Sequence, residues 1–319
     1  MIEVEVRHLT KQYENHLAVD NISFSIETGK IYGFLGPNGA GKSTTMNIIA
    51  GCLAATSGDV IIENHDIFEE QQEAKRHIGY LPELPPLYLD MTPREYLAFV
   101  CEIKRVTKAE RAAAIHENMR RTGLLDVANR QIGQLSKGYR QRVGIAQALV
   151  GNPEVIVLDE PTVGLDPAQI VEIRELVRAL GKDHTVLLSS HILSEVSELC
   201  DEVLILSKGK LVARDTPEKL GELLGSGNRL YMVVEGGEDS VRAVLESTGI
   251  AGVLRLKSVG AGRVSVEAEA DEEAKERIFY AFAQAKMMIR EMRSEKITLE
   301  EIFLEYTGLG KGEPHGSNR

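Results

Sequence analysis

The sequence predicts an α/β fold, followed by a smaller α+β domain. Three observations support this prediction. Short apolar segments with strand character alternate with amphipathic helical segments over residues 22–199. A stretch of purely helical periodicity interrupts this alternation, and a second series of strands and helices follows a glycine- and serine-rich segment. With 319 residues, 43% of them hydrophobic, the chain is long enough to bury two cores.

The first domain is expected over residues 1–221. Its first six residues alternate apolar and charged side chains, as a half-exposed strand does. Further strands are expected at 22–26, 31–35, 60–63, 155–158 and 185–189, and helices at 42–50, 169–180 and 192–199. This alternation indicates a sheet covered on both faces.

A helical subdomain is expected over about residues 91–150 of this domain, with helical periodicity clearest from 92 to about 130. Its first helix has a strong start signal. Thr92 can cap the helix, Pro93 suits the first turn and Glu95 completes a capping box.

The second domain is expected over residues 230–307, after a linker at 222–229. Strands are expected at 230–234, 253–258, 263–267 and 288–292, and helices at 239–247, 271–285 and 298–306. The order is βαββαβ plus a helix, which is the ferredoxin-like arrangement. The polar, glycine-rich tail at 308–319 is expected to be disordered.

Composition limits the classes of partner. A formal net charge of −11 and a pI near 5.4 argue against nucleic acid, because phosphate backbones are bound by clustered Lys and Arg. One stretch does gather basic residues, interleaved with acidic ones, and is interpreted as a solvated helix face. Its basic residues are Lys104, Arg105, Lys108, Arg111, Arg120 and Arg121.

The three cysteines, Cys52, Cys101 and Cys200, are far apart and suit a reducing cytoplasm. The N-terminus has no signal-peptide pattern, and no apolar run approaches the length of a transmembrane helix. We therefore expect a cytoplasmic protein whose membrane contact goes through a partner.

A glycine-rich loop lies between the strand at 31–35 and the helix at 42–50. Its residues are Gly36, Pro37, Asn38, Gly39, Ala40, Gly41, Lys42 and Ser43, in the pattern G-x-x-x-x-G-K-S. Glycines let backbone N–H groups curve around phosphate oxygens, and the helix N-terminus adds partial positive charge. Lys42 can reach the outer phosphates, and the Ser43 hydroxyl can bind Mg²⁺. The loop predicts a nucleoside triphosphate site.

Two acidic residues, Asp159 and Glu160, end the apolar strand at 155–158. Side chains alternate along a strand, so the two carboxylates point in different directions. One could hold magnesium through water while the other faces the water that attacks the γ-phosphate. The alternative is a pair of solvated acids, but the phosphate loop favours the catalytic interpretation.

Several further segments, in order, resemble one family, the ATP-binding subunits of ABC transporters. Leu135, Ser136, Lys137, Gly138 and Tyr139 resemble the ABC signature, Leu-Ser-Gly-Gly-Gln. Gly164, Leu165 and Asp166 are similar to the D-loop. His191 resembles the switch histidine that senses the γ-phosphate, and Tyr13 resembles the aromatic residue that stacks on adenine. The resemblance covers roughly residues 1–220.

The resemblance implies an ATPase that works as a dimer. Two domains would pair head to tail, so that ATP and Mg²⁺ on residues 36–44 of one chain, Thr44 included, are covered by the signature of the other. The start of the helix beyond Ser136 is a second terminus suited to an anion. Glu160, Lys42 and His191 would be catalytic, and Ser43 and Asp159 would hold the metal.

The sequence departs from the family pattern in two places. Glu83 stands where the family usually has a Gln that touches Mg²⁺, and we hypothesise that its carboxylate keeps the metal role. The alternative is a solvated, inert residue. The second departure is Lys137 and Tyr139, both within the signature. The Lys137 ammonium could approach the partner's γ-phosphate or point to water, and we favour water.

Within the family, the segments 78–83, 91–97 and 299–308 resemble ATPases of ABC-2-type exporters. This implies a separate membrane permease, a peripheral location on the inner face of the cell membrane, and a second copy or a homologous ATPase subunit. The loop from Leu84 to Tyr88 could receive the permease or pack against the helical subdomain. A soluble ABC ATPase acting on ribosomes or DNA is the alternative, and a phosphate-loop GTPase is a third class, disfavoured because no Asn-Lys-x-Asp element is present.

Overall fold

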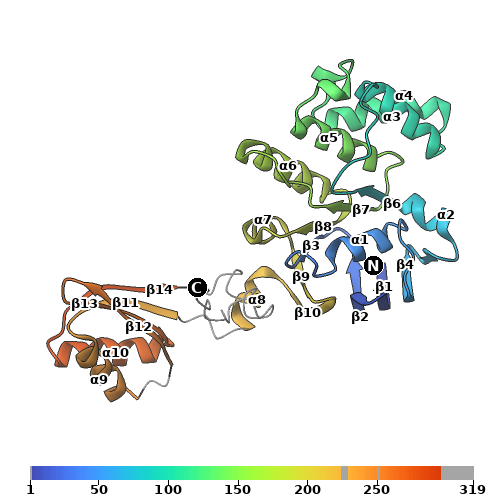
Figure 1. Ribbon diagram of the computed structural model, residues 1–319. Helices are drawn as coiled ribbons and strands as arrows, with labels where there is room; N and C mark the ends of the chain where they lie inside the picture. Colours follow the sequence, from blue (N-terminus) through green and yellow to red (C-terminus); the bar gives the residue numbers. More distant parts are fainter. Residues whose placement is uncertain (1, 224–228, 250–251, 296–319) are drawn as a thin grey trace, which may run out of the picture. The chain divides into compact units, whose positions relative to one another are not determined.

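The computed structural model describes residues 2–223, 229–249 and 252–295 (Figure 1). The chain forms two compact units, the first ending at Pro217 and the second beginning at Glu218. Each unit has a hydrophobic core of its own. A short helix, α8 (Pro217–Leu223), begins at this division.

The first unit contains a six-stranded sheet in the order β10-β9-β3-β8-β7-β6. Its strands are β3 (Ile31–Leu35), β6 (Ile78–Leu81), β7 (Val155–Asp159), β8 (Thr185–Ser190), β9 (Glu202–Ser207) and β10 (Lys210–Asp215). All neighbours are parallel except β9 and β10, which are antiparallel. The central strands β3, β7 and β8 are buried along their whole length. Their carboxyl ends meet at one edge, where open α/β sheets bind ligands.

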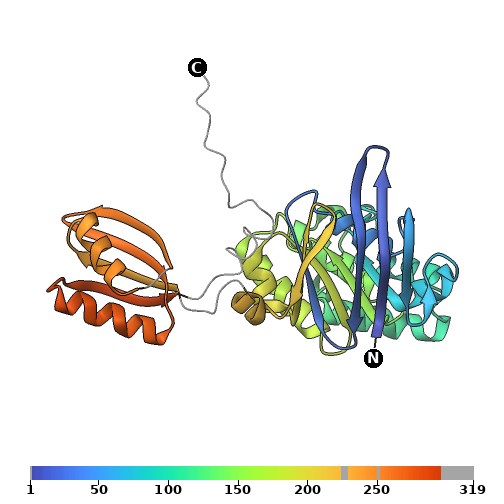
Figure 2. The same ribbon diagram turned by 90° about the horizontal axis from the view of Figure 1, so that it is seen from below.

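A second, antiparallel sheet lies beside the first, in the order β2-β1-β4-β5 (Figure 2). Its strands are β1 (Ile2–Tyr13), β2 (His16–Glu27), β4 (Ser57–Ile62) and β5 (His65–Asp66). Helix α1 (Lys42–Ile49) shares one core with both sheets, because Met46 packs in the cluster that holds Phe24 of β2 and Phe34 of β3. The two Phe rings meet edge to face, 5.4 Å apart. One face of the parallel sheet is therefore covered by a helix together with a sheet.

The other helices of this unit form two groups. The helical subdomain contains α3 (Pro93–Ile103), α4 (Lys108–Arg121) and α5 (Lys137–Ala148), joined by 3₁₀ turns at Leu125–Val127 and Ile132–Gln134. Helices α6 (Pro167–Leu180) and α7 (Leu193–Leu199) belong to the alternating part, and α2 (Gln71–Ala74) with a 3₁₀ turn (Lys75–His77) precedes β6. The predicted capping box of α3 is confirmed, since Thr92 Oγ1 accepts from Glu95 N and Thr92 N donates to Glu95 Oε2.

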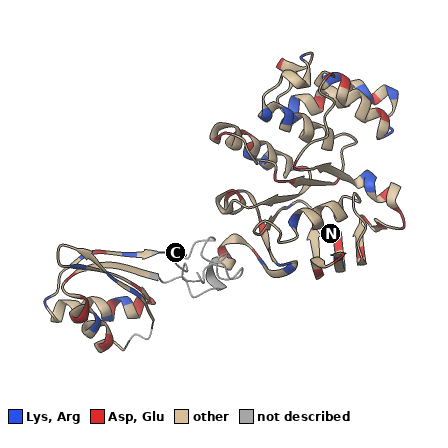
Figure 3. Ribbon diagram, viewed as in Figure 1, with Lys and Arg blue, Asp and Glu red and all other residues tan. Residues whose placement is uncertain are grey.

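Half of the basic stretch of the subdomain is exposed, whereas Lys104, Arg111 and Arg121 are partly buried. Figure 3 shows Lys and Arg interleaved with Asp and Glu on α3 and α4, and Arg120 pairs with Glu117 at 2.6 Å. Lys104 contradicts the prediction of a solvated face. Its Nζ donates to the carbonyl of Val150 at 2.8 Å, and burial lowers its pKa to about 8. The carbonyl at the end of a helix attracts the ammonium inward.

The second unit is a four-stranded antiparallel sheet in the order β12-β13-β11-β14, with two helices. In chain order its elements are β11 (Arg229–Glu235), α9 (Glu238–Ser247), β12 (Val253–Gly260), β13 (Arg263–Glu269), α10 (Glu272–Gln284) and β14 (Ile289–Glu295). Both helices pack on one face, where Leu245 and Phe282 join Met232 of the central strand in a single cluster. The helix expected at 298–306 and the tail at 308–319 lie outside the described residues.

Sequence periodicity missed two parts of the first unit. Strands β9 and β10 were not anticipated, and β2 begins at His16, well before the predicted start at 22. Between Leu9 and Val19 the pairing of β1 with β2 is irregular, with register shifts that break the alternation of side chains. The hairpin is consequently longer than its alternating pattern suggests.

A buried histidine makes the stability of the first unit depend on pH. His184, only 3% exposed, makes a 2.8 Å hydrogen bond from Nδ1 to the Pro153 carbonyl, and its Nε2 has no partner among the described residues. Burial lowers its pKa, because an imidazolium at this place would be poorly solvated. The unfolded chain then takes up the proton first, so stability is lost as the pH falls below about 6.5.

We expect His184→Asn, whose amide can keep the donor to Pro153 but does not titrate, to flatten this dependence. Thermal unfolding followed by circular dichroism at pH 7.5 and 5.5 measures it, since the chain lacks Trp. Equal losses of stability on acidification in both proteins would contradict the assignment to His184.

Candidate active site

A cavity of about 230 Å³ lies at the carboxyl edge of the parallel sheet. It is lined by residues 37–44 of the glycine-rich loop and α1, by Glu83 after β6, by Glu160 and Val163 after β7, and by His191 after β8. Four segments that are far apart in the sequence therefore converge there, because the strands that precede them, β3, β8, β7 and β6, are neighbours in the sheet.

The glycines of the loop are required by the backbone. Gly39 and Gly41 have φ values of 79° and 103°, in the left-handed region that other residues avoid. A Cβ on Gly41 would also lie 2.5 Å from the carbonyl oxygen of Ala18 on β2. Gly41 is the N-cap of α1, so the loop presents a helix N-terminus to the cavity, as an anion site does.

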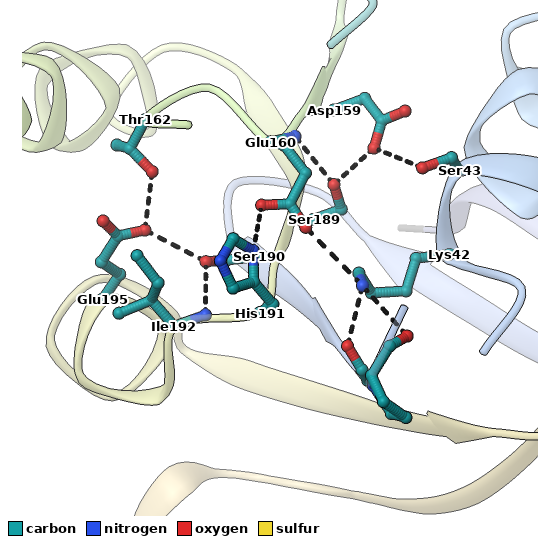
Figure 4. A network of polar contacts seen from close by, with 12 residues as sticks. Lys42, Ser43, Asp159, Glu160, Thr162, Ser189, Ser190, His191, Ile192 and Glu195 are labelled. Carbon is teal, nitrogen blue, oxygen red and sulfur yellow. Dashed lines mark hydrogen bonds and ion pairs between the residues drawn. The ribbon is translucent and has the colours of Figure 1, made fainter. Parts of the chain in front are cut away.

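Lys42 places a buried positive charge in this cavity. Its side chain is 6% exposed, Nζ donates to the carbonyl of Gly36 at 2.8 Å, and the same Nζ lies 3.6 Å from Glu160 Oε1 (Figure 4). An ammonium held among neutral carbonyls and one carboxylate can compensate the charge of a phosphate group that binds beside it.

Asp159 lies beneath the cavity, among hydroxyl groups. Its Oδ1 accepts from Ser43 Oγ at 3.1 Å and from Ser189 Oγ at 2.6 Å. Burial raises the pKa of Asp159, and the two hydrogen bonds act in the opposite direction. Ser189 also accepts from Glu160 N at 2.8 Å, so one hydroxyl fixes both acidic residues.

The donor set fits magnesium. Ser43, Asp159 and Glu83 offer oxygen ligands only, which a small, hard cation prefers. In the described ranges there is no group of three or more His, Cys, Asp or Glu side chains arranged to hold a metal. Phosphate oxygens and water would complete the coordination of a Mg²⁺ ion held by Ser43, Asp159 and Glu83.

Glu160 and His191 form a pair at the mouth of the cavity. His191 Nδ1 lies 2.8 Å from Glu160 Oε2. The Glu160 side chain is 9% exposed, whereas that of His191 is 45% exposed. Glu160 has a φ of 48°, a conformation that costs a non-glycine residue energy and marks many functional positions. The pair presents a carboxylate and an imidazole to the same space.

The signature residues lie elsewhere on the same chain. Ser136 is the N-cap of α5 and accepts from Tyr139 N at 3.4 Å, Leu135 is buried, and none of residues 135–139 lines the phosphate cavity. A Cβ on Gly138 would lie 2.9 Å from the Gln169 side chain, so α5 packs closely on the start of α6. The signature thus caps a helix whose N-terminus is not part of the cavity lining of its own chain.

Lys137 and Tyr139, the two signature residues that depart from the family pattern, both contact other residues of their own chain. Tyr139 donates from its hydroxyl to Asp126 Oδ2 at 2.8 Å. The exposed Lys137 has its ammonium beside Gly164, where a Cβ would lie 2.2 Å from Nζ. The exposure of Lys137 agrees with the expectation that its side chain points to water. Its contact with Gly164 of the D-loop was not predicted from the sequence. In that loop Leu165 N donates to the Thr162 carbonyl, and Asp166 caps α6 by accepting from Gln169 N at 3.0 Å.

Tyr13 lies outside the phosphate cavity. It ends β1 at the hairpin turn, is 43% exposed, and takes part in a shallow depression formed by residues 12–16. The ammonium of Lys11 lies 5.1 Å from its ring centre. The ring is accessible for stacking, and its role with adenine stays a prediction.

A phosphate loop after the first parallel strand, with acidic residues after a neighbouring strand, defines a nucleoside triphosphatase of the phosphate-loop class. Residues 19–163 match the ABC transporter family. The bacitracin transport ATP-binding protein BcrA of Bacillus licheniformis is 41% identical over 244 residues, covering 76% of this chain and 78% of that protein. The ABC transporter ATP-binding protein YhcH of Bacillus subtilis (strain 168) is 34% identical over 313 residues, covering 97% of each.

Solved structures agree. The structure of an ATP-binding subunit of an ABC transporter superposes with a TM-score of 0.64 at 29% identity, covering 70% of this chain and 94% of that chain. A dimeric ATP-binding cassette in a post-hydrolysis state, bound to ADP and Pi, gives 0.61 at 28% identity, covering 67% and 98%. The chain belongs to the ABC transporter family and is one of its ATP-binding, ATP-hydrolysing subunits.

Several residues around the cavity were not singled out from the sequence. Val163 lines it, and Ser189 holds the two acids. The pair Ser189-Ser190 at the end of an apolar strand was a usable signal, because hydroxyls there have backbone and carboxylate partners within reach. Outside the cavity, the buried Glu195 of α7, which accepts hydrogen bonds from Thr162 and Ser190, was also missed, because one Glu on an amphipathic helix has no distinguishing local pattern.

Proposed function

We propose that two cassettes form composite ATP sites, in which the cavity of one chain is completed by the signature of the other, and that their closure and hydrolysis drive export through a separate permease. The observation that carries this proposal is the separation within one chain: residues 135–139 are absent from the lining of the cavity that holds Lys42, Glu160 and His191. The N-terminus of α5, which Ser136 caps, is suited to an anion, and in the proposed dimer the ATP phosphates bound to the second chain are that anion.

In this proposal the residues around the cavity divide the chemistry of phosphoryl transfer. Lys42 neutralises charge on the outer phosphates, and the backbone N–H groups of the loop orient them. Glu160 polarises the attacking water, while His191, held by Glu160, binds the γ-phosphate. Ser43, Asp159 and Glu83 would hold Mg²⁺, which when bound offsets negative charge on the β- and γ-phosphates.

Glu83 gives the metal hypothesis a direct test. Its carboxylate repels bare ATP and attracts Mg²⁺, so we expect wild type to bind ATP more weakly without the metal than Glu83→Gln does. The difference in ATP affinity with and without Mg²⁺, measured by calorimetry, should shrink several-fold in the variant. Equal metal dependence in both proteins would show that Glu83 is solvated and inert.

Export and an ABC-2-type permease are supported by similarity and by the surface. BcrA is named for bacitracin transport, and LnrL of Bacillus subtilis (strain 168), 30% identical over 96% of this chain, for linearmycin resistance. Among the described residues no helix has the length and apolar character to span a membrane. Leu84 and Tyr88, beside Glu83, are 79% and 50% exposed and offer apolar contacts to a permease at the inner face of the membrane.

Purification of the tagged full chain from membranes tests the proposed partner. We expect a multi-spanning protein to copurify and to be lost from Leu84→Asp. A ribosome or DNA partner found instead would overturn the transport proposal in favour of the soluble alternative.

A further inference from the structure

A buried acidic residue outside the cavity ties together the two turns that carry Glu160 and His191. Glu195 lies in the first turn of α7, is 5% exposed, and is absent from the cavity lining. Its Oε2 accepts from Thr162 Oγ1 at 2.8 Å and from Ser190 Oγ at 3.1 Å (Figure 4). Thr162 follows Glu160 by two residues, and Ser190 directly precedes His191.

The environment of Glu195 is unfavourable for a residue that only fills space. Within the described part of the chain its Oε1 is buried without a hydrogen-bond partner, and no salt bridge includes the carboxylate. Burying a carboxylate with two neutral donors costs free energy relative to an apolar side chain. A residue of this kind is better explained by the geometry it imposes than by stability.

The hydrogen bonds fix both turns from the same point. Ser190 donates to Glu195 and at the same time accepts from Ile192 N at 3.0 Å, so His191 is bracketed by two anchored residues. Thr162 and Ser190 are only 4% and 0% exposed, so water cannot replace Glu195 as the hydrogen-bond partner of their hydroxyls. The carbonyl of Thr162 also accepts from Leu165 N of the D-loop.

We propose that Glu195 is a positioning residue for ATP hydrolysis, which sets the spacing of Glu160 and His191 by holding the hydroxyls of Thr162 and Ser190 on one oxygen. The inference rests on the proposed roles of Glu160 and His191. It deepens them, because the same carboxylate connects these two residues with the turn that leads into the D-loop.

The test measures kcat and KM for ATP with the full chain. We expect Glu195→Ala to lower kcat about tenfold or more with KM changed less than about twofold, because the glycine-rich loop provides most of the phosphate contacts in the proposed site, whereas Glu195 bonds to Thr162 and Ser190. Glu195→Gln, which keeps an acceptor oxygen, should retain most activity. Removing both donors, in Thr162→Val with Ser190→Ala, should lower kcat as much as Glu195→Ala, and adding Glu195→Ala to that pair should lower it no further.

Two matched controls separate positioning from general damage. Glu198→Ala makes the same chemical change as Glu195→Ala on the same helix, at an exposed residue that pairs with Arg174, and should leave kcat unchanged. Thr122→Val removes a hydroxyl that is fully buried in the helical subdomain, and should lower the melting temperature without lowering kcat.

The inference is overturned if Glu195→Ala and the double hydroxyl variant keep wild-type kcat, or if kcat falls only in proportion to the lost melting temperature. If Glu195→Ala does not fold, the double hydroxyl variant and Glu195→Gln decide between the outcomes. Glu160→Gln separates failure of the proposed site from failure of the positioning role. Rapid hydrolysis by Glu160→Gln would reject the proposed site. Slow hydrolysis by Glu160→Gln together with full activity of Glu195→Ala would reject only the positioning role of Glu195.

Discussion

Replacing Glu160 by Gln is expected to lower kcat about a thousandfold, while ATP still binds and holds the protein as a dimer. The amide keeps the size of the side chain, but it cannot take a proton from the attacking water. It also removes the negative charge that lies 3.6 Å from Lys42 Nζ, so the affinity for the anionic nucleotide should stay equal or rise. Phosphate release measures turnover, and light scattering after size exclusion with ATP measures the dimer.

Glu175→Gln is the matched control for that experiment. Glu175 is an exposed residue of α6 that pairs with Arg178, so the same substitution there should change neither turnover nor assembly. Rapid hydrolysis by Glu160→Gln would remove Glu160 from its proposed role. A variant that is slow and stays monomeric with bound ATP would contradict the proposed composite site.

Two inactive variants are expected to restore each other when mixed. Lys42→Met removes the buried ammonium from the cavity, and Gly138→Asp puts a negative charge at the helix terminus that would face the partner's phosphate. Each protein alone should hydrolyse ATP at least about a hundredfold more slowly than wild type. In a mixed dimer one site combines the intact Lys42 with the intact Gly138, so an equal mixture should recover about a quarter of wild-type activity.

The three atoms nearest to a Cβ at Gly138 all belong to the Gln169 side chain, which can move aside, so we expect the subdomain of Gly138→Asp to stay folded; circular dichroism can verify this. As a control for exchange of subunits, Lys42→Met is mixed with wild type and not with Gly138→Asp. An equal mixture of the two inactive variants that stays inactive, under conditions where exchange is demonstrated, would contradict sharing of the site between two chains.

Much of the site could be predicted from the sequence, because its parts are contiguous. The pattern from Gly36 to Ser43 specifies backbone conformation and charge within eight adjacent residues, and the structure has the left-handed glycines and the helix start there. The capping box at Thr92 and Glu95 is local in the same way. Strand periodicity gave the buried central strands, since strands covered on both faces are apolar throughout.

Contacts between distant residues were beyond that kind of prediction. Lys104 was expected in water, but it bonds to the carbonyl of Val150, which is on another helix end. Strand periodicity carries no information on which strands are neighbours, so it could not reveal that Ser189 reaches Asp159. Helix periodicity likewise does not tell which loop a helix contacts, so the position of Lys137 beside Gly164 could not be predicted. Most of the hairpin of β1 and β2 was not predicted, because irregular pairing interrupts the alternation of apolar and polar side chains from which strands are predicted.

The sequence by itself determined the chemistry of this protein: a phosphate loop with its lysine, an acidic pair, a helix-capping signature and a histidine, each specified by neighbouring residues. Only the tertiary structure decided how these parts combine. The order β3-β8-β7 brings Lys42, Glu160 and His191 into one cavity, keeps residues 135–139 out of its lining, and places Glu195 against the turns that carry Glu160 and His191. The physical reason is that side-chain chemistry is a property of single residues, whereas distance between them is set by strand order and packing.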